Sequence, residues 1–230
     1  MSCIVITGAS RGIGRCIASA FIQRGFPVAL LSRQEESLNQ VAHELSTRKE
    51  GPPILPIACD VSQTDQVETA VDHILVQLGP PLAIINNAGL FRHASVMSMK
   101  ETEWDEIVAT NLKGPFLITR AFLPVMFKQK KGRFIALSSI SGTQGTPYLS
   151  AYCASKWGLI GFTKSLAEEL RGTGLQALCI LPGSVDTDML KESGFYPPTM
   201  QPEEVARVVV YTAIDAPAAM NGSAIELFGP

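Results

Sequence analysis

The sequence predicts an α/β fold: one domain, residues 1–230, built on a parallel sheet of about seven strands with helices on both faces. Short apolar runs that suit buried strands alternate with longer segments that have helical apolar spacing. Clusters of glycine and proline, such as residues 51–53 and 79–81, separate these segments. The composition, 46% hydrophobic and 17% charged, is sufficient for a sizeable core.

The predicted elements follow one another without an internal repeat or linker. Strands are predicted at residues 3–7, 27–32, 54–59, 82–85, 133–138, 175–181 and 224–228. Helices are predicted from the first glycine turn to residue 24 and at residues 35–49, 63–78, 103–129, 150–171 and 202–213. The run 82–85 is fully apolar, as a parallel strand covered on both faces should be. Within residues 103–129, Gly114, Pro115 and Pro124 are expected to kink or divide the helix.

Composition limits the classes of partner. The formal net charge of −2 gives no general attraction to nucleic acid or to an anionic membrane, so neither is an expected partner. The apolar run at the N-terminus is too short for a signal peptide or a membrane span, and a cytoplasmic location is expected. The five cysteines show no metal-site spacing and the chain has three histidines, so no metal site is expected and the thiols should be reduced.

A glycine-rich turn joins the first predicted strand to the first helix. It reads TGASRGIG over residues 7–14, with the glycines spaced G-x-x-x-G-x-G. Glycine lets the backbone approach a pyrophosphate closely, and the free N–H groups of the helix N-terminus face that anion. We therefore expect a dinucleotide phosphate site here; the alternative is a glycine-rich turn without a ligand.

The end of the second strand bears on which dinucleotide binds. Domains that bind NAD usually carry an acidic residue there, which holds the ribose 2′-hydroxyl. Here the sequence is Ser32-Arg33-Gln34, without a carboxylate, and the planar cation of Arg33 suits a phosphate. Arg11 in the glycine turn is expected to flank the same group. Both residues favour NADP(H); the alternative is that Arg33 is a solvated residue at a helix start.

Tyr152 and Lys156 lie four residues apart in the predicted helix 150–171. Side chains at this spacing share a helix face, with about 5–6 Å between their Cβ atoms. A nearby ammonium favours the phenolate, so we expect Lys156 to lower the pKa of Tyr152 from its usual value near 10. A tyrosine tuned in this way suits general acid–base catalysis. The spacing alone is a weak motif, because Tyr and Lys fall four apart by chance in many helices.

Taken in order, the motifs of the chain resemble those of the short-chain dehydrogenase/reductases, along nearly the whole length. The matching elements are the glycine turn, Asp60-Val61, Asn86-Asn87-Ala88-Gly89, Asn111, Ser139, Tyr152-x-x-x-Lys156, and Pro182-Gly183 followed by Thr187 and Met189. Within the family, the chain is most similar to NADPH-dependent 3-oxoacyl-carrier-protein reductases and small carbonyl reductases. The resemblance implies a doubly wound Rossmann-type sheet with strand order 3-2-1-4-5-6-7, and assembly as a homodimer or homotetramer.

The resemblance also implies four catalytic residues. Tyr152 would donate a proton to a carbonyl oxygen as hydride arrives from NADPH. Lys156 would lower the pKa of Tyr152 and hold the ribose hydroxyls of the nicotinamide nucleotide. Ser139 would hydrogen-bond the carbonyl oxygen. Asn111 would hold a water in a proton relay that ends at Lys156, although a bland role as a helix-bending amide is the alternative.

The implied cofactor-binding set is larger. It comprises Gly8, Ser10, Arg11, Gly12, Ile13, Gly14, Arg33, Asp60, Val61, Asn87, Ala88, Gly89, Tyr152, Lys156, Pro182, Gly183, Val185 and Thr187. The resemblance implies that Asp60 and Val61 contact the adenine. It also implies that Asn87 fixes the adjacent strand and the cofactor, and that Thr187 holds the nicotinamide carboxamide.

The implied function is NADPH-dependent reduction of a small-molecule ketone, aldehyde, quinone or 3-oxoacyl group to an alcohol. The alternatives are a cofactor-binding regulator or scaffold without turnover, and an NADP-dependent alcohol dehydrogenase working in the oxidative direction. An acyl carrier protein is a candidate partner, because Lys128, Lys130, Lys131 and Arg133 form a basic stretch; a solvated helix end is the blander interpretation. We expect His93 to be a loop residue and not a catalyst.

Two departures from the family pattern concern the substrate. Residues 190–201 are few for the helical lid that usually covers it, and Gly194, Pro197 and Pro198 restrict helix formation further. We therefore expect an open, weakly selective site that prefers small or planar carbonyls, with Phe195, Tyr196 and Met200 as candidate rim residues. The sequence also ends in LFGP, without the usual acidic-diglycine ending, which leaves the choice between dimer and tetramer open.

Overall fold

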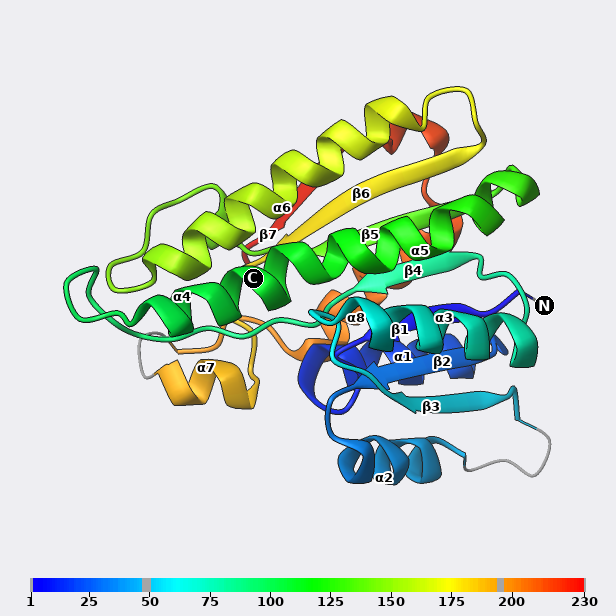
Figure 1. Cartoon of the computed structure of the whole chain (residues 1–230), viewed down its shortest axis with the longest axis horizontal. Helices are drawn as coiled ribbons and strands as arrows, with labels where there is room; N and C mark the ends of the chain where they lie inside the picture. Colours follow the sequence, from blue (N-terminus) through cyan, green and yellow to red (C-terminus); the bar gives the residue numbers. More distant parts are fainter. Residues whose placement is uncertain (1, 47–50, 194–196, 230) are drawn as a thin grey trace.

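The computed structural model of the chain describes residues 2–46, 51–193 and 197–229, and these form one seven-stranded parallel sheet (Figure 1). The strand order is β3-β2-β1-β4-β5-β6-β7, which confirms both the fold class and the order that the resemblance implied. The strands are β1 (Ile4–Thr7), β2 (Val28–Ser32), β3 (Ile54–Ala58), β4 (Ala83–Asn86), β5 (Gly132–Leu137), β6 (Leu175–Pro182) and β7 (Ala224–Leu227).

Helices cover both faces of the sheet because alternate strand residues point to opposite sides. Ile4 and Ile6 of β1 pack into a core shared with α1, α2 and α8, whereas Val5 packs into a second core shared with α3, α5 and α6. The helices are α1 (Gly12–Gln23), α2 (Glu35–Leu45), α3 (Thr64–Gln77), α4 (Glu101–Val108), α5 (Gly114–Gln129), α6 (Ser150–Glu169), α7 (Asp188–Ser193) and α8 (Pro202–Val210). None of the helices in the described ranges combines the length and the apolar character needed to cross a bilayer.

The long helical segment after β4 is divided directly before Gly114 and Pro115. A π-helix, η1 (Ala109–Lys113), separates α4 from α5, and Asn111 lies at its centre. Pro115 lies in the first turn of α5, next to η1, and Pro124 lies inside α5 without ending it. The expected division is therefore present near Gly114 and Pro115, as a change of helix type, and absent at Pro124.

Smaller differences from the predicted elements have local causes. The helix after β2 ends at Leu45, and residues 47–49, where it was expected to end, lie outside the described ranges. The helix after residue 201 changes to a π-helix, η3 (Tyr211–Asp215), and the guanidinium of Arg133 donates to the carbonyls of Thr212 and Ala216 at its end. Arg133 therefore caps a helix and does not belong to an exposed basic stretch.

The turn between β1 and α1 is so tight that it admits no side chain at Gly14. A Cβ built there would lie 2.2 Å from the carbonyl oxygen of Gly8 and 2.6 Å from Nδ2 of Asn87. Gly14→Ala should therefore lower the free energy of unfolding by about 2 kcal/mol or more, measured by urea denaturation.

Gly161 on the exposed side of α6 is the matched control for this substitution. A Cβ there would have no neighbour within 4 Å. Gly161→Ala should raise the free energy of unfolding by about 0.5–1 kcal/mol through helix propensity alone. Equal losses in the two variants would show that the crowding at Gly14 does not matter.

Candidate active site

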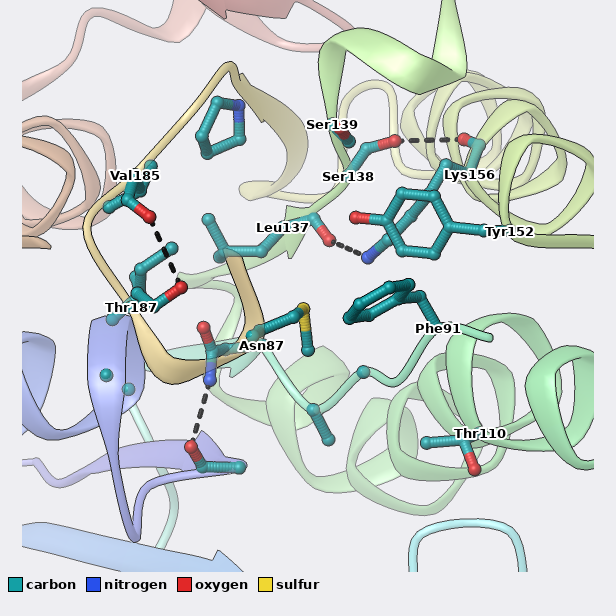
Figure 2. Close-up of a pocket in the computed structure, with 18 of the residues that line it drawn as sticks. Asn87, Phe91, Thr110, Leu137, Ser138, Ser139, Tyr152, Lys156, Val185 and Thr187 are labelled. Atoms are coloured by element: carbon teal, nitrogen blue, oxygen red, sulfur yellow. Dashed lines mark hydrogen bonds between the residues drawn. The ribbon is translucent and has the colours of Figure 1, made fainter. Parts of the chain in front are cut away.

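A cavity of about 650 Å³ lies at the carboxyl ends of the strands (Figure 2). Segments that follow β1, β2, β3, β4, β5 and β6 line it, together with the first two turns of α6. Every residue that the sequence placed in the catalytic or cofactor-binding sets lines this cavity, with the exception of Asn111. Open α/β sheets bind ligands at this edge, next to the point where the strand order reverses, which here lies between β1 and β4.

The ends of β1 and β4 are joined by side-chain hydrogen bonds. Thr7 Oγ1 accepts from the backbone N–H groups of Asn87 and Ala88, at 3.0 Å each. Asn87 Nδ2 donates back to the carbonyls of Thr7 and Gly8, at 2.9 and 3.1 Å. This junction brings the glycine turn against the loop after β4. Gly8 has a φ of +65° there, and a Cβ on it would lie 2.8 Å from Ala88 Cα.

Arg33 and Arg11, the two predicted phosphate ligands, lie on the cavity wall beside carboxylates from other elements. Arg33 Nη1 is 3.7 Å from Oε1 of Glu106 on α4. Arg11 Nη1 lies 3.9 Å from the carboxylates of Asp188 and Glu192 on α7. The guanidinium of Arg11 thus contacts the short helix α7, and the expectation that it shares a phosphate with Arg33 stays a prediction.

Tyr152 and Lys156 project from α6 toward the middle of the cavity, as Figure 2 shows. Lys156 Nζ donates to the backbone carbonyl of Leu137 at 2.8 Å and lies 5.5 Å from the centroid of the Tyr152 ring. Ser139, at the end of β5, accepts from the N–H of Ser141 at 3.1 Å and begins a short 3₁₀ turn. The three side chains come from the two elements that flank the loop between β5 and α6.

Burial dominates the titration of this pair. It raises the pKa of Tyr152 to about 12, while a hydrogen bond with Ser139 acts in the opposite direction. It lowers the pKa of Lys156 to about 8. The expectation that Lys156 lowers the pKa of Tyr152 is therefore wrong, because the cost of burying a phenolate outweighs an ammonium that is itself desolvated and bound to Leu137. At neutral pH Tyr152 carries its proton.

Asn111 lies behind the cavity wall, fully buried at the centre of η1. Its Oδ1 accepts from the N–H of Leu90 at 2.9 Å, and its Nδ2 donates to the carbonyl of Leu90 at 2.8 Å and to Ser155 Oγ at 3.0 Å. The amide thus clamps the loop after β4 to α6. The expectation that Asn111 holds a water stays a prediction.

Several lining residues were not foreseen. The ring of Phe91 meets that of Tyr152 edge to face, with centroids 6.4 Å apart. An aromatic residue two positions after the turn Asn86-Asn87-Ala88-Gly89 was a signal that could have identified Phe91. Leu137 contributes its backbone carbonyl, which accepts from Lys156, and a backbone contact of this kind cannot be read from the residue type. His93 lies in the loop after Phe91, as expected, with its ring 5.0 Å from that of Tyr148.

Of the expected rim residues, Phe195 and Tyr196 lie outside the described ranges. Met200 is buried in the core shared by α1 and α8, and its residue pairs with Val185 in an isolated parallel bridge. The expectation that Met200 forms an apolar rim is therefore wrong, because its side chain packs inward. Met189 and Leu190, on α7, line the cavity instead.

Comparisons with known proteins agree with this geometry. The family model of the short chain dehydrogenases matches residues 2–195. The 3-oxoacyl-(acyl-carrier-protein) reductase FabG of Thermotoga maritima is 33% identical over 238 residues, covering 98% of this chain and 95% of that protein. The crystal structure of a short-chain type dehydrogenase/reductase from Mycobacterium marinum has a TM-score of 0.92 at 32% identity, covering 99% and 94% of the two chains. Levodione reductase has a TM-score of 0.94 at 26% identity, covering 99% and 96%.

Replacement of Lys156 by methionine tests the burial of its charge. The pKa of Lys156 is about 8 in the folded protein against an ordinary 10.5, so between these pH values the unfolded chain binds a proton that the folded protein has lost. The free energy of unfolding of the wild type should therefore rise with pH relative to that of Lys156→Met. The difference should change by roughly 3 kcal/mol from pH 7.5 to pH 10.5.

Urea denaturation of both proteins across this pH range measures the effect. Groups that titrate in the same range and are not coupled to Lys156, such as Cys3 and Cys59, are shared by the two proteins and cancel in the difference. A difference that stays constant with pH would show that Lys156 keeps an ordinary pKa.

Proposed function

The chain belongs to the short-chain dehydrogenase family, and we propose that it is an NADPH-dependent reductase that converts a carbonyl group to an alcohol. The observation that carries this proposal is the buried phenol of Tyr152, which holds its proton at neutral pH beside Ser139 and Lys156 in a cavity that begins at the glycine turn. A proton donor at this position suits reduction, because the oxygen of the accepting carbonyl needs a proton as hydride arrives.

The residues present fit a dinucleotide cofactor. The glycine turn places the N-terminus of α1 on the cavity, with Gly8, Gly12 and Gly14 all lining it. Helix N-termini and glycine backbones bind phosphates in this way. Asp60 and Val61 would hold the adenine, Thr187 the carboxamide and Lys156 the ribose hydroxyls. When bound, NADPH supplies the hydride, and the protein supplies position and electrostatics.

The chain's own residues would then protonate the carbonyl oxygen of the substrate and stabilise the negative charge that develops on it. The Tyr152 hydroxyl donates the proton, and Ser139 Oγ donates a hydrogen bond to the oxygen as negative charge develops on it. Lys156 is held in place by the carbonyl of Leu137. The clamp of Asn111 on Leu90 holds the loop that carries Phe91 beside Tyr152.

The substrate proposed here is a small or planar carbonyl compound that packs against Phe91. Phe91 and Leu149 give this part of the cavity apolar walls, and Met189 and Leu190 of α7 add to them. Two similar proteins are named for carbonyl substrates, a 3-oxoacyl group and levodione. A carrier-bound 3-oxoacyl group is the second candidate, with Lys128, Lys130 and Lys131 as exposed contacts for an acyl carrier protein.

We further propose that the chain works as one domain, in a cytoplasmic homodimer or homotetramer.

Removal of the Tyr152 hydroxyl tests the catalytic assignment. Tyr152→Phe should lower the rate of NADPH oxidation with an activated diketone or quinone by about 10²–10⁴-fold, because it deletes the proton donor. Binding of NADPH, followed by its fluorescence, should change less than about threefold, since little volume is lost. Tyr148→Phe makes the same chemical change at an exposed tyrosine and should leave the rate unchanged.

A wild-type protein that binds NADPH but turns over no carbonyl compound would favour the regulatory alternative. A Tyr152→Phe variant with the wild-type rate would show that another group donates the proton.

The proposed preference for NADPH depends on Arg33. A charge-assisted contact between its guanidinium and a phosphate contributes about 1.5–3 kcal/mol, so NADPH should bind at least tenfold more tightly than NADH. In Arg33→Asp this preference should shrink or reverse, because a carboxylate repels the phosphate and can accept a hydrogen bond from a 2′-hydroxyl. Titration of both proteins with both cofactors gives the ratio, and equal affinities in the wild type would contradict the assignment.

A further inference from the structure

An ionic cluster at the edge of the cavity has no place in the mechanism above. Glu106 Oε1 lies 3.7 Å from Arg33 Nη1, and the other oxygen, Oε2, accepts from Arg92 Nη2 at 3.2 Å. One carboxylate thus bridges two arginines from different loops, the one after β2 and the one after β4. We call Arg33, Glu106 and Arg92 the rim cluster.

The rim cluster is positioned by rigid neighbours. Glu106 precedes the fully buried Ile107 in α4 and lies one helical turn before Thr110, which lines the cavity. Arg92 follows Phe91, which also lines the cavity, and its Nη1 donates to the carbonyl of Phe91 at 3.2 Å. Glu106 is therefore fixed beside the cavity entrance, next to the arginine proposed to bind a 2′-phosphate.

The ion pairs of the rim cluster contribute little to the fold. The three side chains are 57%, 39% and 47% exposed, for Arg33, Glu106 and Arg92. Ion pairs that are this exposed add little to stability. Their charges nevertheless act on an anionic ligand, because the ligand would bind to Arg33 within a few ångströms of the Glu106 carboxylate.

We propose that Glu106 is a positioning residue that sets how strongly the protein discriminates NADPH from NADH. This inference rests on the proposed use of NADPH. The Glu106 carboxylate offsets part of the positive charge of Arg33, and Arg92 in turn offsets Glu106. The rim cluster then presents a net charge of +1 to the 2′-phosphate, while NADH, which lacks that group, should respond much less to it.

Opposite changes in the rim cluster should have opposite effects. Glu106→Gln keeps the shape and raises the net charge of the cluster by one, so NADPH should bind about three- to tenfold more tightly. Arg92→Gln lowers the net charge by one and leaves Glu106 acting on Arg33 alone, so NADPH should bind more weakly by a similar factor. Glu106→Asp retains the charge and should stay close to the wild type. NADH affinity should change less than twofold in all three variants.

The experiment is a fluorescence titration of the wild type and the variants with NADPH and with NADH, at low and at high salt. Glu68→Gln is the matched control, because it removes a carboxylate from another exposed ion pair, Arg120–Glu68, whose residues do not line the cavity. Competition by adenosine 2′,5′-bisphosphate against AMP should reproduce the same ratios without the nicotinamide half. The differences between variants should shrink as salt rises, since screening weakens exposed charges.

Two negative outcomes can be told apart. A wild type that does not prefer NADPH would overturn the cofactor assignment of the proposed function, and the direction of the Glu106→Gln change would still decide the role of Glu106. A wild type that prefers NADPH, combined with a Glu106→Gln variant whose ratio of affinities is unchanged or lower, would overturn the role of Glu106 alone. Equal shifts for NADPH and NADH would likewise overturn it, because a structural disturbance affects both.

Discussion

The hydrogen bonds that join the ends of β1 and β4 are the contact on which the site depends most. Thr7 and Asn87 exchange donors and acceptors there, at the point where the strand order reverses. This exchange draws the glycine turn against the loop after β4 so closely that Gly8 and Gly14 admit no side chain. The glycine turn and the loop after β4, held together by these hydrogen bonds, form part of the cavity wall.

Desolvation, and not attraction between neighbours, governs the protonation of the central pair. Tyr152 and Lys156 are both deeply buried, so each is shifted toward its neutral form, upward in pKa for the phenol and downward for the ammonium. The carbonyl of Leu137 fixes the lysine by a hydrogen bond. A phenol that keeps its proton is ready to give it to a carbonyl oxygen, and the ammonium of Lys156 has two further N–H donors for other hydroxyl groups.

Most strands and helices could be predicted from the sequence, because apolar runs, helical spacing and glycine turns are local patterns. The order of the strands in the sheet followed from the family resemblance and not from these patterns. The site was predictable where residue type carries the chemistry, as for Tyr152 and the glycines. The site could not be predicted where its properties depend on how deeply a side chain is buried or on contacts between segments far apart in the sequence. The spacing of Tyr152 and Lys156 shows that they share a helix face but not how deeply that face is buried. The contact of Glu106 with Arg33 joins residues from separate elements, and the carbonyl of Leu137 has no counterpart in residue type.

The π-helix η1 also limits how the length of this part of the chain can change. A π turn contains one residue more than an α turn, so deletion of one residue among 109–113 would merge α4 and α5 into a continuous α-helix. Because the deletion removes only the extra residue of one full turn, α4 and α5 would keep their faces toward their present neighbours. The residues of the π turn itself would change position, and Asn111, whose amide contacts Leu90 and Ser155, is one of them. Deletions should therefore be rejected here during evolution because they displace Asn111, even though no residue of this turn except Thr110 lines the cavity.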